Sequence, residues 1–205
     1  MISNNEREII LSFCEKKFLT EGFVKVTMDE IAKELGISKK TIYKHFTSKD
    51  ILVSEIVHIR LKNAHSNVMS VLSTKADAVR KFIELINVYT YEIRGIHPKW
   101  FREIELHKPD LWKEIDNFRS KLINNYLPKV ITQGIRQKLI KSYSPELIIL
   151  AFTSLSKEIM NTEFLINSKQ SLEEIIRETF DMLFGGLLTK KGLAIFSKDK
   201  KFISK

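Results

Sequence analysis

The sequence predicts an all-α protein, and three observations support this fold class. Apolar residues recur at the spacing of amphipathic helices, and capping residues precede several of these periodic segments. No segment shows the strict alternation of apolar and polar residues that marks a half-buried strand. The 205 residues include only 4 prolines and 7 glycines, so few breaks are expected between long helices.

The composition is that of a globular chain with a basic balance, a net charge of +9. Hydrophobic residues make up 43% and charged residues 29%, which excludes fibrous and disordered classes. The longest apolar run, 147–152, is far shorter than the roughly 20 residues that span a bilayer, so we expect a cytoplasmic protein without a membrane partner. The single cysteine, Cys14, lies one turn from Ile10 and Phe18 and is expected to be a buried structural thiol.

The clearest local signal is a helix that begins after Thr27. Thr27 is a good N-cap, and Glu30 completes a capping box that satisfies free amide groups of the first turn. The apolar stripe of this helix consists of Met28, Ile31, Ala32 and Leu35. Ala32 is small enough to let a second helix approach closely.

A tight turn and a second short helix follow. Gly36 stands where a left-handed residue ends a helix at little cost, and Ser38 can cap the next helix. Within that helix Ile42 and Phe46 lie about one turn apart and face inward. The outward face then carries Lys40, Thr41, Tyr43 and Lys44.

This segment has a positive charge that suits a polyanion. Between Glu34 and Asp50 there is no acidic residue, whereas four lysines stand there, namely Lys39, Lys40, Lys44 and Lys49. Thr47 and Asp50 form a second capping pattern, which would place another helix start beside a phosphate. The pattern indicates a helix-turn-helix that binds duplex DNA. The alternative is a packing motif with a solvated lysine face.

Residues 22–52 resemble the N-terminal signature of the TetR/AcrR family of transcriptional regulators, and the resemblance extends over about 7–53, including the Gly22-Phe23 corner. It implies a three-helix DNA-binding domain at 1–48 and a larger helical-bundle domain for ligand binding and dimerisation at 49–205. It also implies a homodimer that binds a pseudo-palindromic operator in double-stranded DNA through successive major grooves, with repression as the usual outcome.

Carried over residue by residue, the resemblance assigns contacts to DNA. Lys39, Lys40 and Thr41 would face base edges, and Lys44 would contact either bases or phosphates. The phosphate contacts would come from Thr27, Tyr43, His45 and Lys49, with Ser38 in the same interface. Because lysine donates to O6 and N7 of guanine, a half-site that contains G is expected.

The remaining chain is expected to be helical throughout. We expect helices at about 49–70 and 75–94, from Pro98, from Pro109 towards Gly134, and at about 144–165 and 171–187. Pro128 should kink or break its helix because it lacks an amide donor. The basic segment 190–205 is expected to be a frayed extension, with packing of Phe196 on the body as the alternative.

Two functional surfaces are expected in this larger part. The last two helices have apolar faces wider than one core stripe, which indicates a dimer interface. The residues assigned to it are Met160, Phe164, Ile176, Phe180, Leu183, Phe184 and Leu187. The resemblance implies a pocket for a mostly apolar small-molecule effector, although the aromatic residues alone indicate only a core. The residues assigned to the pocket are Ile86, Tyr89, Thr90, Phe101, Phe118, Leu122, Phe152 and Ser156.

No glycine-rich phosphate loop, nucleophile motif or metal-ligand spacing is present in the sequence. We therefore expect no catalysis, no cofactor and no metal site. Three alternatives remain open. They are an activator of the same fold, a DNA-binding protein that answers to a protein partner or to no ligand, and a helical-bundle enzyme or small-molecule carrier.

Overall fold

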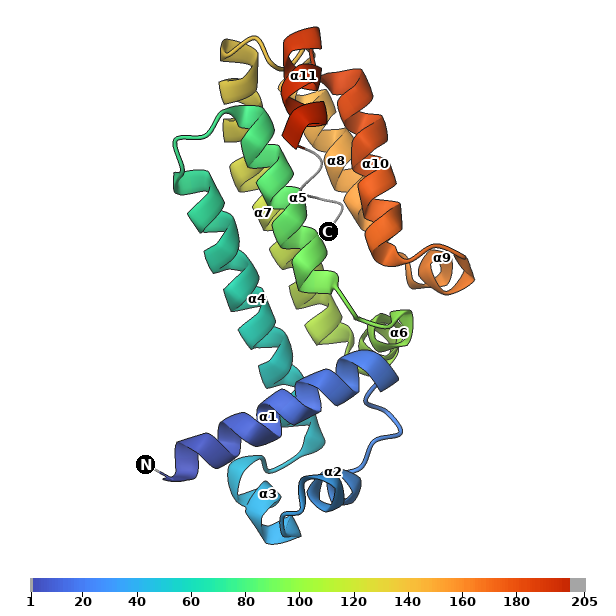
Figure 1. Ribbon diagram of the computed structural model, residues 1–205. Helices are drawn as coiled ribbons and strands as arrows, with labels where there is room; N and C mark the ends of the chain where they lie inside the picture. The colour runs from blue at the N-terminus through green and yellow to red at the C-terminus, as the bar shows by residue number, and fades with distance from the viewer. Residues whose placement is uncertain (1, 200–205) are drawn as a thin grey trace. The chain divides into compact units, whose positions relative to one another are not determined.

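The computed structural model describes residues 2–199, which form the helices α1 to α11 (Figure 1). The all-α prediction is confirmed, because the only β feature within residues 2–199 is an isolated bridge between Ile140 and Leu188. By compactness the chain divides into two units. The first extends to Lys62 and also includes Gly95–Glu114, and the second comprises Asn63–Arg94 and the described chain from Ile115. The predicted division into a DNA-binding domain at 1–48 and a ligand-binding and dimerisation domain at 49–205 concerns function and stays a prediction.

The first unit is a small helical domain with a single core. Its helices are α1 (Ile2–Glu21), α2 (Met28–Leu35), α3 (Lys39–His45), the beginning of α4 (Lys49–Ser73), α6 (Pro98–His107) and the first residues of α7 (Pro109–Arg136). The core contains the fully buried side chains of Phe18, Ile31, Ile42, Phe46 and Leu52. These residues come from the apolar stripes of α1 to α4, so the predicted inward faces of α2 and α3 are observed.

Helix α6 joins the first unit through polar contacts to the end of α1. The Glu103 carboxylate is buried and accepts hydrogen bonds from the amides of Phe23 (2.5 Å) and Val24 (2.9 Å). Lys99 Nζ donates to the Glu21 carbonyl at 2.6 Å. Gly22 has a φ of +83°, and a Cβ atom there would lie 2.6 Å from Glu103 Oε2. The Gly22 corner and α6 therefore fit one another.

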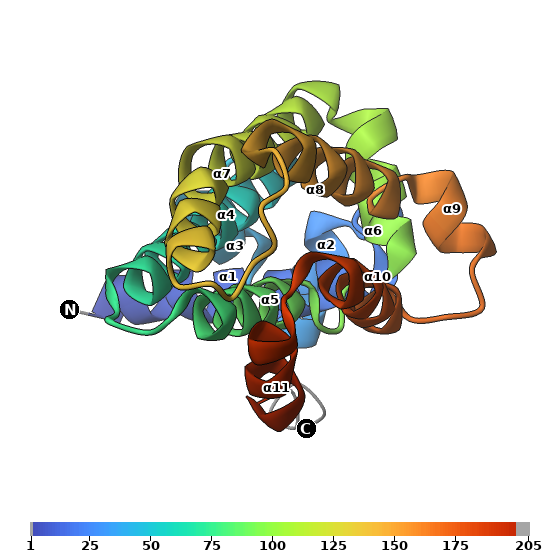
Figure 2. The ribbon, with the colours of Figure 1, turned by 90° about the horizontal axis from the view of Figure 1, so that it is seen from above.

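The second unit is a helical bundle. Besides the remainder of α4, its helices are α5 (Ala78–Ile93), most of α7 (Pro109–Arg136), α8 (Pro145–Ile159), α9 (Thr162–Asn167), α10 (Leu172–Leu187) and α11 (Lys190–Asp199). Helix α5 contacts both α10 and α11, and α10 also contacts α8 (Figure 2). Helices α5, α8, α10 and α11 contribute an aromatic cluster, consisting of Phe82, Phe152, Phe180, Phe184 and Phe196.

The C-terminal segment corrects one prediction. Residues Lys190–Asp199 form α11, and Phe196 is buried with its ring centroid 5.0 Å from that of Phe184. Arg80 Nε donates to Asp199 at 2.8 Å, which ties the end of α11 to α5. The expected fraying is therefore wrong as far as Asp199, because an aromatic anchor and an ion pair hold the helix. Residues 200–205 of the expected extension lie outside the described residues.

Helix boundaries differ from the sequence predictions at three further points. Helix α7 continues through Pro128 to Arg136, so the predicted break does not occur. The helix expected at 144–165 ends at Ile159, because Asn161 accepts bonds from the amides of Glu163 and Phe164 and starts α9. Ser48, rather than Thr47, caps α4 by accepting from the Ile51 amide. None of the described helices combines the length and the apolar character that crossing a membrane would require.

Candidate functional site

Helices α2 and α3 and their turn have the local geometry that the sequence predicts. The Glu30 amide donates to Thr27 Oγ1 at 3.1 Å, and the Thr27 amide donates back to Glu30 Oε2 at 3.5 Å. Gly36 has a φ of +66°, in the left-handed region, and ends α2. Ser38 Oγ accepts from the Thr41 amide at 3.0 Å and starts α3. Each end of the turn is thus held by contacts within a few residues.

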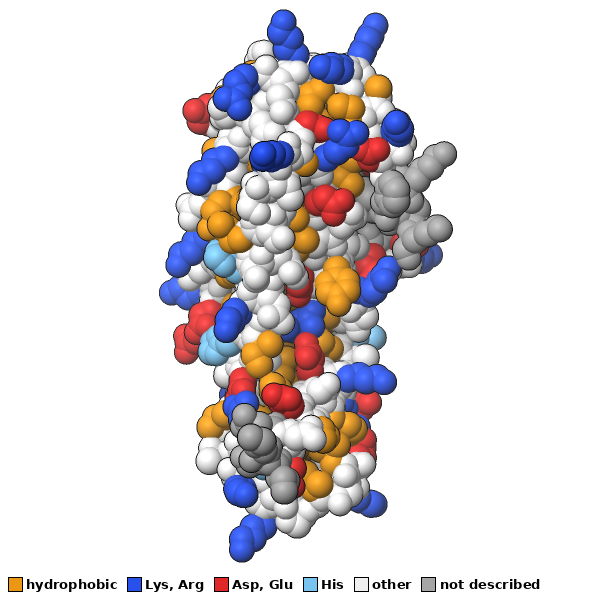
Figure 3. Space-filling model, turned by 60° about the vertical axis from the view of Figure 1, so that its left-hand side comes forward, with side chains coloured by type: hydrophobic (Ala, Val, Ile, Leu, Met, Phe, Trp, Pro, Cys, Tyr) orange, Lys and Arg blue, Asp and Glu red, His pale blue; other side chains and the backbone are white. Residues whose placement is uncertain are grey.

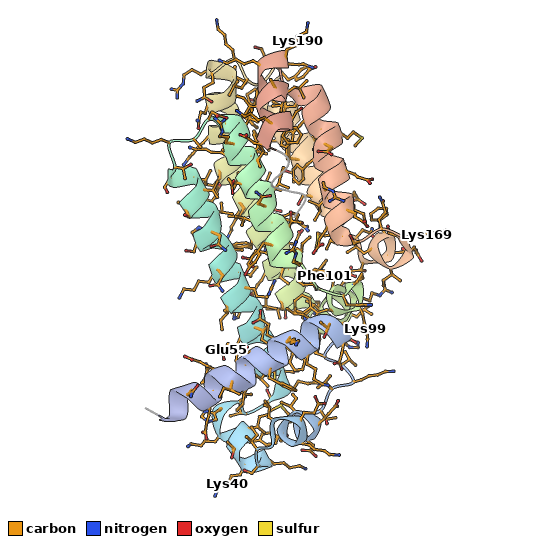
Figure 4. All side chains as sticks on the ribbon, in the orientation of Figure 1. Lys40, Glu55, Lys99, Phe101, Lys169 and Lys190 are labelled. Atoms are coloured by element: carbon orange, nitrogen blue, oxygen red, sulfur yellow. The ribbon has the colours of Figure 1, made fainter. Side chains whose placement is uncertain are left out.

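The outer face of α3 is cationic and available to a partner. Lys40, Tyr43 and Lys44 are exposed, whereas Ile42 on the opposite face is fully buried. Within the described part of the chain, these three exposed side chains have no hydrogen bond or ion pair. Lys40 projects outward from the start of α3 (Figure 4), and Figure 3 shows several Lys and Arg side chains at this end of the first unit. Such a face can bind a polyanion without first breaking internal contacts.

Lys39 and Thr41, also predicted to face bases, have local contacts. Lys39 Nζ forms an ion pair with Asp29 of α2, and both side chains are largely exposed. Exposed pairs of this kind contribute about 0–1 kcal/mol, so Lys39 can exchange Asp29 for a phosphate or a base at little cost. The Thr41 hydroxyl lies 2.8 Å from Ser38 Oγ.

The structure assigns Lys49 an internal role in place of the predicted phosphate contact. Lys49 Nζ donates to the carbonyls of Phe23 (2.8 Å), Val24 (2.9 Å) and Val26 (2.7 Å). An ammonium group has three donors, so this set uses all of them. Lys49 therefore closes the loop between α1 and α2, a role that its position in the sequence does not reveal.

The predicted phosphate contact of His45 also does not fit its position in the structure. Its side chain is only 7% exposed, and Nε2 lies 3.2 Å from Glu6 Oε2 of α1. A buried imidazole with a carboxylate neighbour presents little surface to a phosphate. His45 thus connects α3 to α1, and the predicted phosphate contacts keep Tyr43, Lys44 and the exposed N-cap Thr27.

Two basic residues that the sequence analysis did not single out also fasten the first unit. Lys17 Nζ lies 2.9 Å from Glu34 and 3.3 Å from Glu30, both on α2, and the hydrogen bond that Lys17 donates to Glu34 raises the pKa of Lys17. Arg7 binds Glu55 of α4 at 2.5 Å and stacks over the Phe46 ring. These contacts join residues far apart in sequence, so local patterns cannot predict them.

Four of the residues predicted for a dimer interface face the core of the second unit. Met160, Ile176, Phe184 and Leu187 are buried and present little surface to a partner, whereas Phe180 and Leu183 are half-buried and Phe164 is exposed. Helical periodicity shows that α8 and α10 have wide apolar faces but does not say which side is covered within the subunit. The exposed apolar residues of these helices are Leu147 (58%), Leu150 (62%) and Met182 (69%).

The residues predicted for the effector site belong to both units. Phe101 lies in the first unit, buried against Trp100, whereas the other seven belong to the second. The Thr90 hydroxyl donates to the Ile86 carbonyl and is not free to orient a ligand. Ile86 and Phe152 are buried, while Phe118 and Leu122 are half-buried.

Tyr89 and Ser156 do lie together, from α5 and α8. Burial raises the pKa of Tyr89, and the nearby Arg119 guanidinium and Ser156 hydroxyl oppose that shift. Arg119, on α7, is a candidate that the sequence analysis missed, because a lone arginine at a helical position carries no local signal.

Comparison with known proteins identifies the first unit. Residues 10–56 match the family described as "Bacterial regulatory proteins, tetR family". The chain is 32% identical over 101 residues to the HTH-type transcriptional regulator EthR of Mycolicibacterium smegmatis. The aligned segment covers 47% of this chain and 45% of that protein. It is 25% identical over 149 residues to an HTH-type transcriptional regulator of Staphylococcus aureus strain MRSA252, covering 63% of this chain and 80% of the relative.

Solved structures share the fold over nearly the whole chain. A TetR-family transcriptional regulator from Marinobacter aquaeolei has a TM-score of 0.72 at 20% identity, covering 94% of this chain and 97% of its own. A putative transcriptional regulator from Saccharomonospora viridis, solved in complex with choline, has a TM-score of 0.71 at 18% identity, covering 91% and 100%. At these identities the likeness concerns the fold. The matched residues 10–56, which contain the capped α2–α3 pair, show that this chain is a transcriptional regulator with a DNA-binding segment of the TetR family.

Proposed function

We propose that this regulator is a ligand-responsive repressor that binds a pseudo-palindromic operator as a homodimer and acts in the cytoplasm without catalysis. The observation that carries the proposal is the outer face of α3, where Lys40, Tyr43 and Lys44 are exposed and have no partner among residues 2–199. In this assignment Lys40 and Thr41 contact base edges, Lys39 exchanges its partner Asp29 for DNA, and Tyr43 and Lys44 hold phosphates.

The DNA contacts can be tested by fluorescence anisotropy on an operator mapped by footprinting upstream of the gene for this chain. Lys44→Ala should weaken binding to all sequences alike and lower the salt slope by about 1, because it removes a phosphate contact. Lys40→Ala should reduce discrimination between operator and random DNA, and a G-containing half-site is the expected target. Lys16→Ala, an exposed lysine on α1, is the matched control. Equal losses on operator and random DNA for Lys40→Ala would argue against base recognition.

Exposed apolar residues support a dimer through α8 and α10. Leu147 and Leu150 lie on α8 and Met182 on α10, and the two helices contact one another. Gly185 and Gly186 follow Met182, and a Cβ at either would meet nothing within 4 Å, so a partner helix could approach closely. Two such helices from each subunit form a four-helix interface around a two-fold axis.

A mass measurement by analytical ultracentrifugation tests this interface. Met182→Glu and Leu150→Glu should yield monomers that lose operator affinity, because each introduces a charge into the proposed apolar contact. Tyr91→Glu, at an exposed position on α5, controls for the added charge. Intact dimers in both interface variants would exclude this surface.

Ligand response is proposed from the interior of the second unit and from the fold relatives. The Saccharomonospora viridis regulator binds choline, so this fold accommodates a small molecule. Coupling between effector and operator is typically about 1–3 kcal/mol and is reciprocal, so DNA must weaken the ligand by the same factor. Equal ligand affinity with and without operator would exclude induction by that compound. A mobility-shift assay with the upstream region, followed by reporter assays, separates this reading from an activator and from a non-DNA-binding carrier.

A further inference from the structure

Three helices of the second unit contribute polar side chains to one interior region. Tyr89 lies on α5, Arg119 on α7, and Thr153 and Ser156 on α8. Arg119 and Ser156 are close enough to Tyr89 to change its titration, and Thr153 shares a helix face with Ser156 because the two are three residues apart. Tyr89, Arg119 and Ser156 therefore meet in one region of the bundle, and Thr153 lies one turn before Ser156 on α8; we call these four residues the Tyr89–Arg119 cluster.

Two hydroxyl groups of this cluster are buried without partners. Tyr89 Oη and Thr153 Oγ1 are inaccessible to solvent, and neither forms a hydrogen bond of normal length and angle within the described residues, although Ser156 and Arg119 lie near enough to Tyr89 to interact with its hydroxyl. An unsatisfied buried polar group costs about 1–3 kcal/mol. By contrast, the nearby Thr90 hydroxyl on the same helix has a partner, the Ile86 carbonyl. The unused hydroxyls indicate that the cluster is arranged for a group that the polypeptide does not supply.

The donors of the cluster determine what that group must be. Burial raises the pKa of Tyr89, so its phenol stays protonated at neutral pH and offers a donor. The Arg119 side chain is 14% exposed, and its guanidinium forms an ion pair with Asp116. A guanidinium has five N–H donors, and the contact with Asp116 occupies only part of this set. Tyrosine, arginine and two hydroxyls together favour a ligand group rich in acceptors.

The surroundings of the cluster are apolar. Ile86 and Phe82 precede Tyr89 by about one and two turns on α5, and both are buried. The Phe82 ring stacks on that of Phe152 at 5.9 Å, and Phe152 precedes Ser156 by one turn on α8. The polar side chains therefore lie at one end of an apolar stripe shared by α5 and α8.

We propose that the effector carries a single carboxylate, bound by Arg119 and Tyr89, on an apolar body that lies along Phe82, Ile86 and Phe152. This inference rests on the ligand response proposed above and gives the chemical class of the ligand. Asp116 offsets part of the Arg119 charge, so a monoanion fits better than a doubly charged phosphate. A cationic head such as a quaternary ammonium would be repelled by Arg119 and could not accept the phenolic hydrogen bond.

Direct binding of three probes to the purified full-length protein tests the inference. Octanoate, octanol and octyltrimethylammonium share one apolar chain and differ in the head group. Isothermal titration calorimetry without DNA measures each affinity for the wild-type protein, Tyr89→Phe and Arg119→Met. Lys121→Met is the matched control, because it removes an exposed cation from the same helix.

We expect wild type to bind octanoate more tightly than the other two probes. Arg119→Met should weaken octanoate by about tenfold to a hundredfold, as expected for loss of a charge-assisted bond, and leave octanol unchanged. Tyr89→Phe should weaken octanoate by about threefold to tenfold, yet leave the thermal midpoint of the free protein unchanged or higher, because it removes an unsatisfied hydroxyl. Lys121→Met should bind like wild type.

Several results would overturn the inference. These are no binding of octanoate, tighter binding of octanol or of the ammonium probe, or equal octanoate affinity in wild type and Arg119→Met. A lower thermal midpoint of free Tyr89→Phe would also contradict it, since the hydroxyl would then have a structural role. Operator binding is measured separately, so failure of the carboxylate assignment would leave the DNA-binding function standing.

Discussion

The two units of the molecule differ in the contacts that hold their interiors together. In the first unit, the Glu103 carboxylate accepts hydrogen bonds from two backbone amides, and Lys49 donates hydrogen bonds to three carbonyls. In the second unit, aromatic rings pack against one another, while the hydroxyls of Tyr89 and Thr153 form no hydrogen bond of normal geometry among the described residues. The first unit thus depends on these polar contacts, although Trp100 Nε1 has no partner among the described residues, and the second unit depends on apolar packing.

This difference corresponds to the proposed tasks of the two units. A surface that recognises DNA must present Lys40, Tyr43 and Lys44 in one geometry, and the contacts of His45 with Glu6 and of Lys49 with three carbonyls hold α3 and its neighbours in place. A unit that responds to a ligand must be stabilised when the ligand binds, and donors without a partner in the free protein can provide this stabilisation. Polar deletions should therefore be costly in the first unit, and apolar deletions in the second.

The largest effect is expected from Phe184→Ala in the second unit. The side chain is fully buried, and rings of Phe82, Phe180 and Phe196 surround it. Truncation should lower the free energy of unfolding by about 3–5 kcal/mol, through lost apolar burial and a residual cavity. Urea unfolding monitored by circular dichroism measures it. A loss below about 1 kcal/mol would show that the aromatic cluster does not hold this unit together.

Next comes Gly22→Ala in the first unit. Alanine would adopt a positive φ with strain, and its Cβ would displace the Glu103 carboxylate from the amides of Phe23 and Val24. We expect a loss of about 2–4 kcal/mol in the free energy of unfolding. Gly36→Ala is the control, since its φ is also positive but nothing lies within 4 Å of the added Cβ, and only about 1–2 kcal/mol should be lost. Equal losses at the two glycines would mean that the Glu103 contact contributes nothing.

A pair of lysine substitutions separates stability from DNA binding. Lys49→Met removes the donor shared by three carbonyls and should cost about 1–2 kcal/mol of stability. Lys44→Met, at an exposed position on α3, should change stability by less than about 0.5 kcal/mol while weakening DNA binding. Urea midpoints and anisotropy titrations on the same preparations test both. The opposite pattern, with Lys49→Met stable and defective only in DNA binding, would restore Lys49 as a phosphate contact.

The smallest effect concerns Cys14 and pH. Burial raises the pKa of the Cys14 thiol from 9.0 to about 12, so the folded state holds the proton more tightly than the unfolded state. The stability from this group is therefore complete below pH 9 and is lost as pH rises towards 12, by about 1 kcal/mol per pH unit. Urea midpoints between about pH 8 and about pH 10 for wild type and Cys14→Ala measure it. Identical pH slopes in the two proteins would show that the thiol does not titrate on unfolding.

Sequence reasoning succeeded where contacts are local. The Thr27–Glu30 capping box, the left-handed Gly36 and the Ser38 cap appear as predicted, because each depends on residues within four positions of one another. The buried faces of α2 and α3 follow from the same periodicity. The predicted contacts of Lys40, Tyr43 and Lys44 with DNA remain predictions that their exposure supports.

Sequence reasoning failed where an apolar helix face could pack against either of two neighbours. The apolar faces of α10 were assigned to a dimer, but Ile176 and Phe184 face the subunit core and Met182 faces outward. The basic composition of the C-terminal segment predicts fraying, but Phe196 packs against Phe184. Apolar periodicity gives the width of a face, whereas which neighbour covers it depends on how all helices pack.

By itself, the sequence determined the helical class, the capped helix-turn-helix and its cationic outer face. Only the tertiary structure decided that Lys49 and His45 serve the interior, that α6 belongs with α1, and that Arg119 lies near Tyr89. The physical reason is the range of the interactions. A cap joins residues three or four positions apart, but the Glu103 carboxylate and the Phe23 amide are 80 positions apart and meet only when the chain has packed.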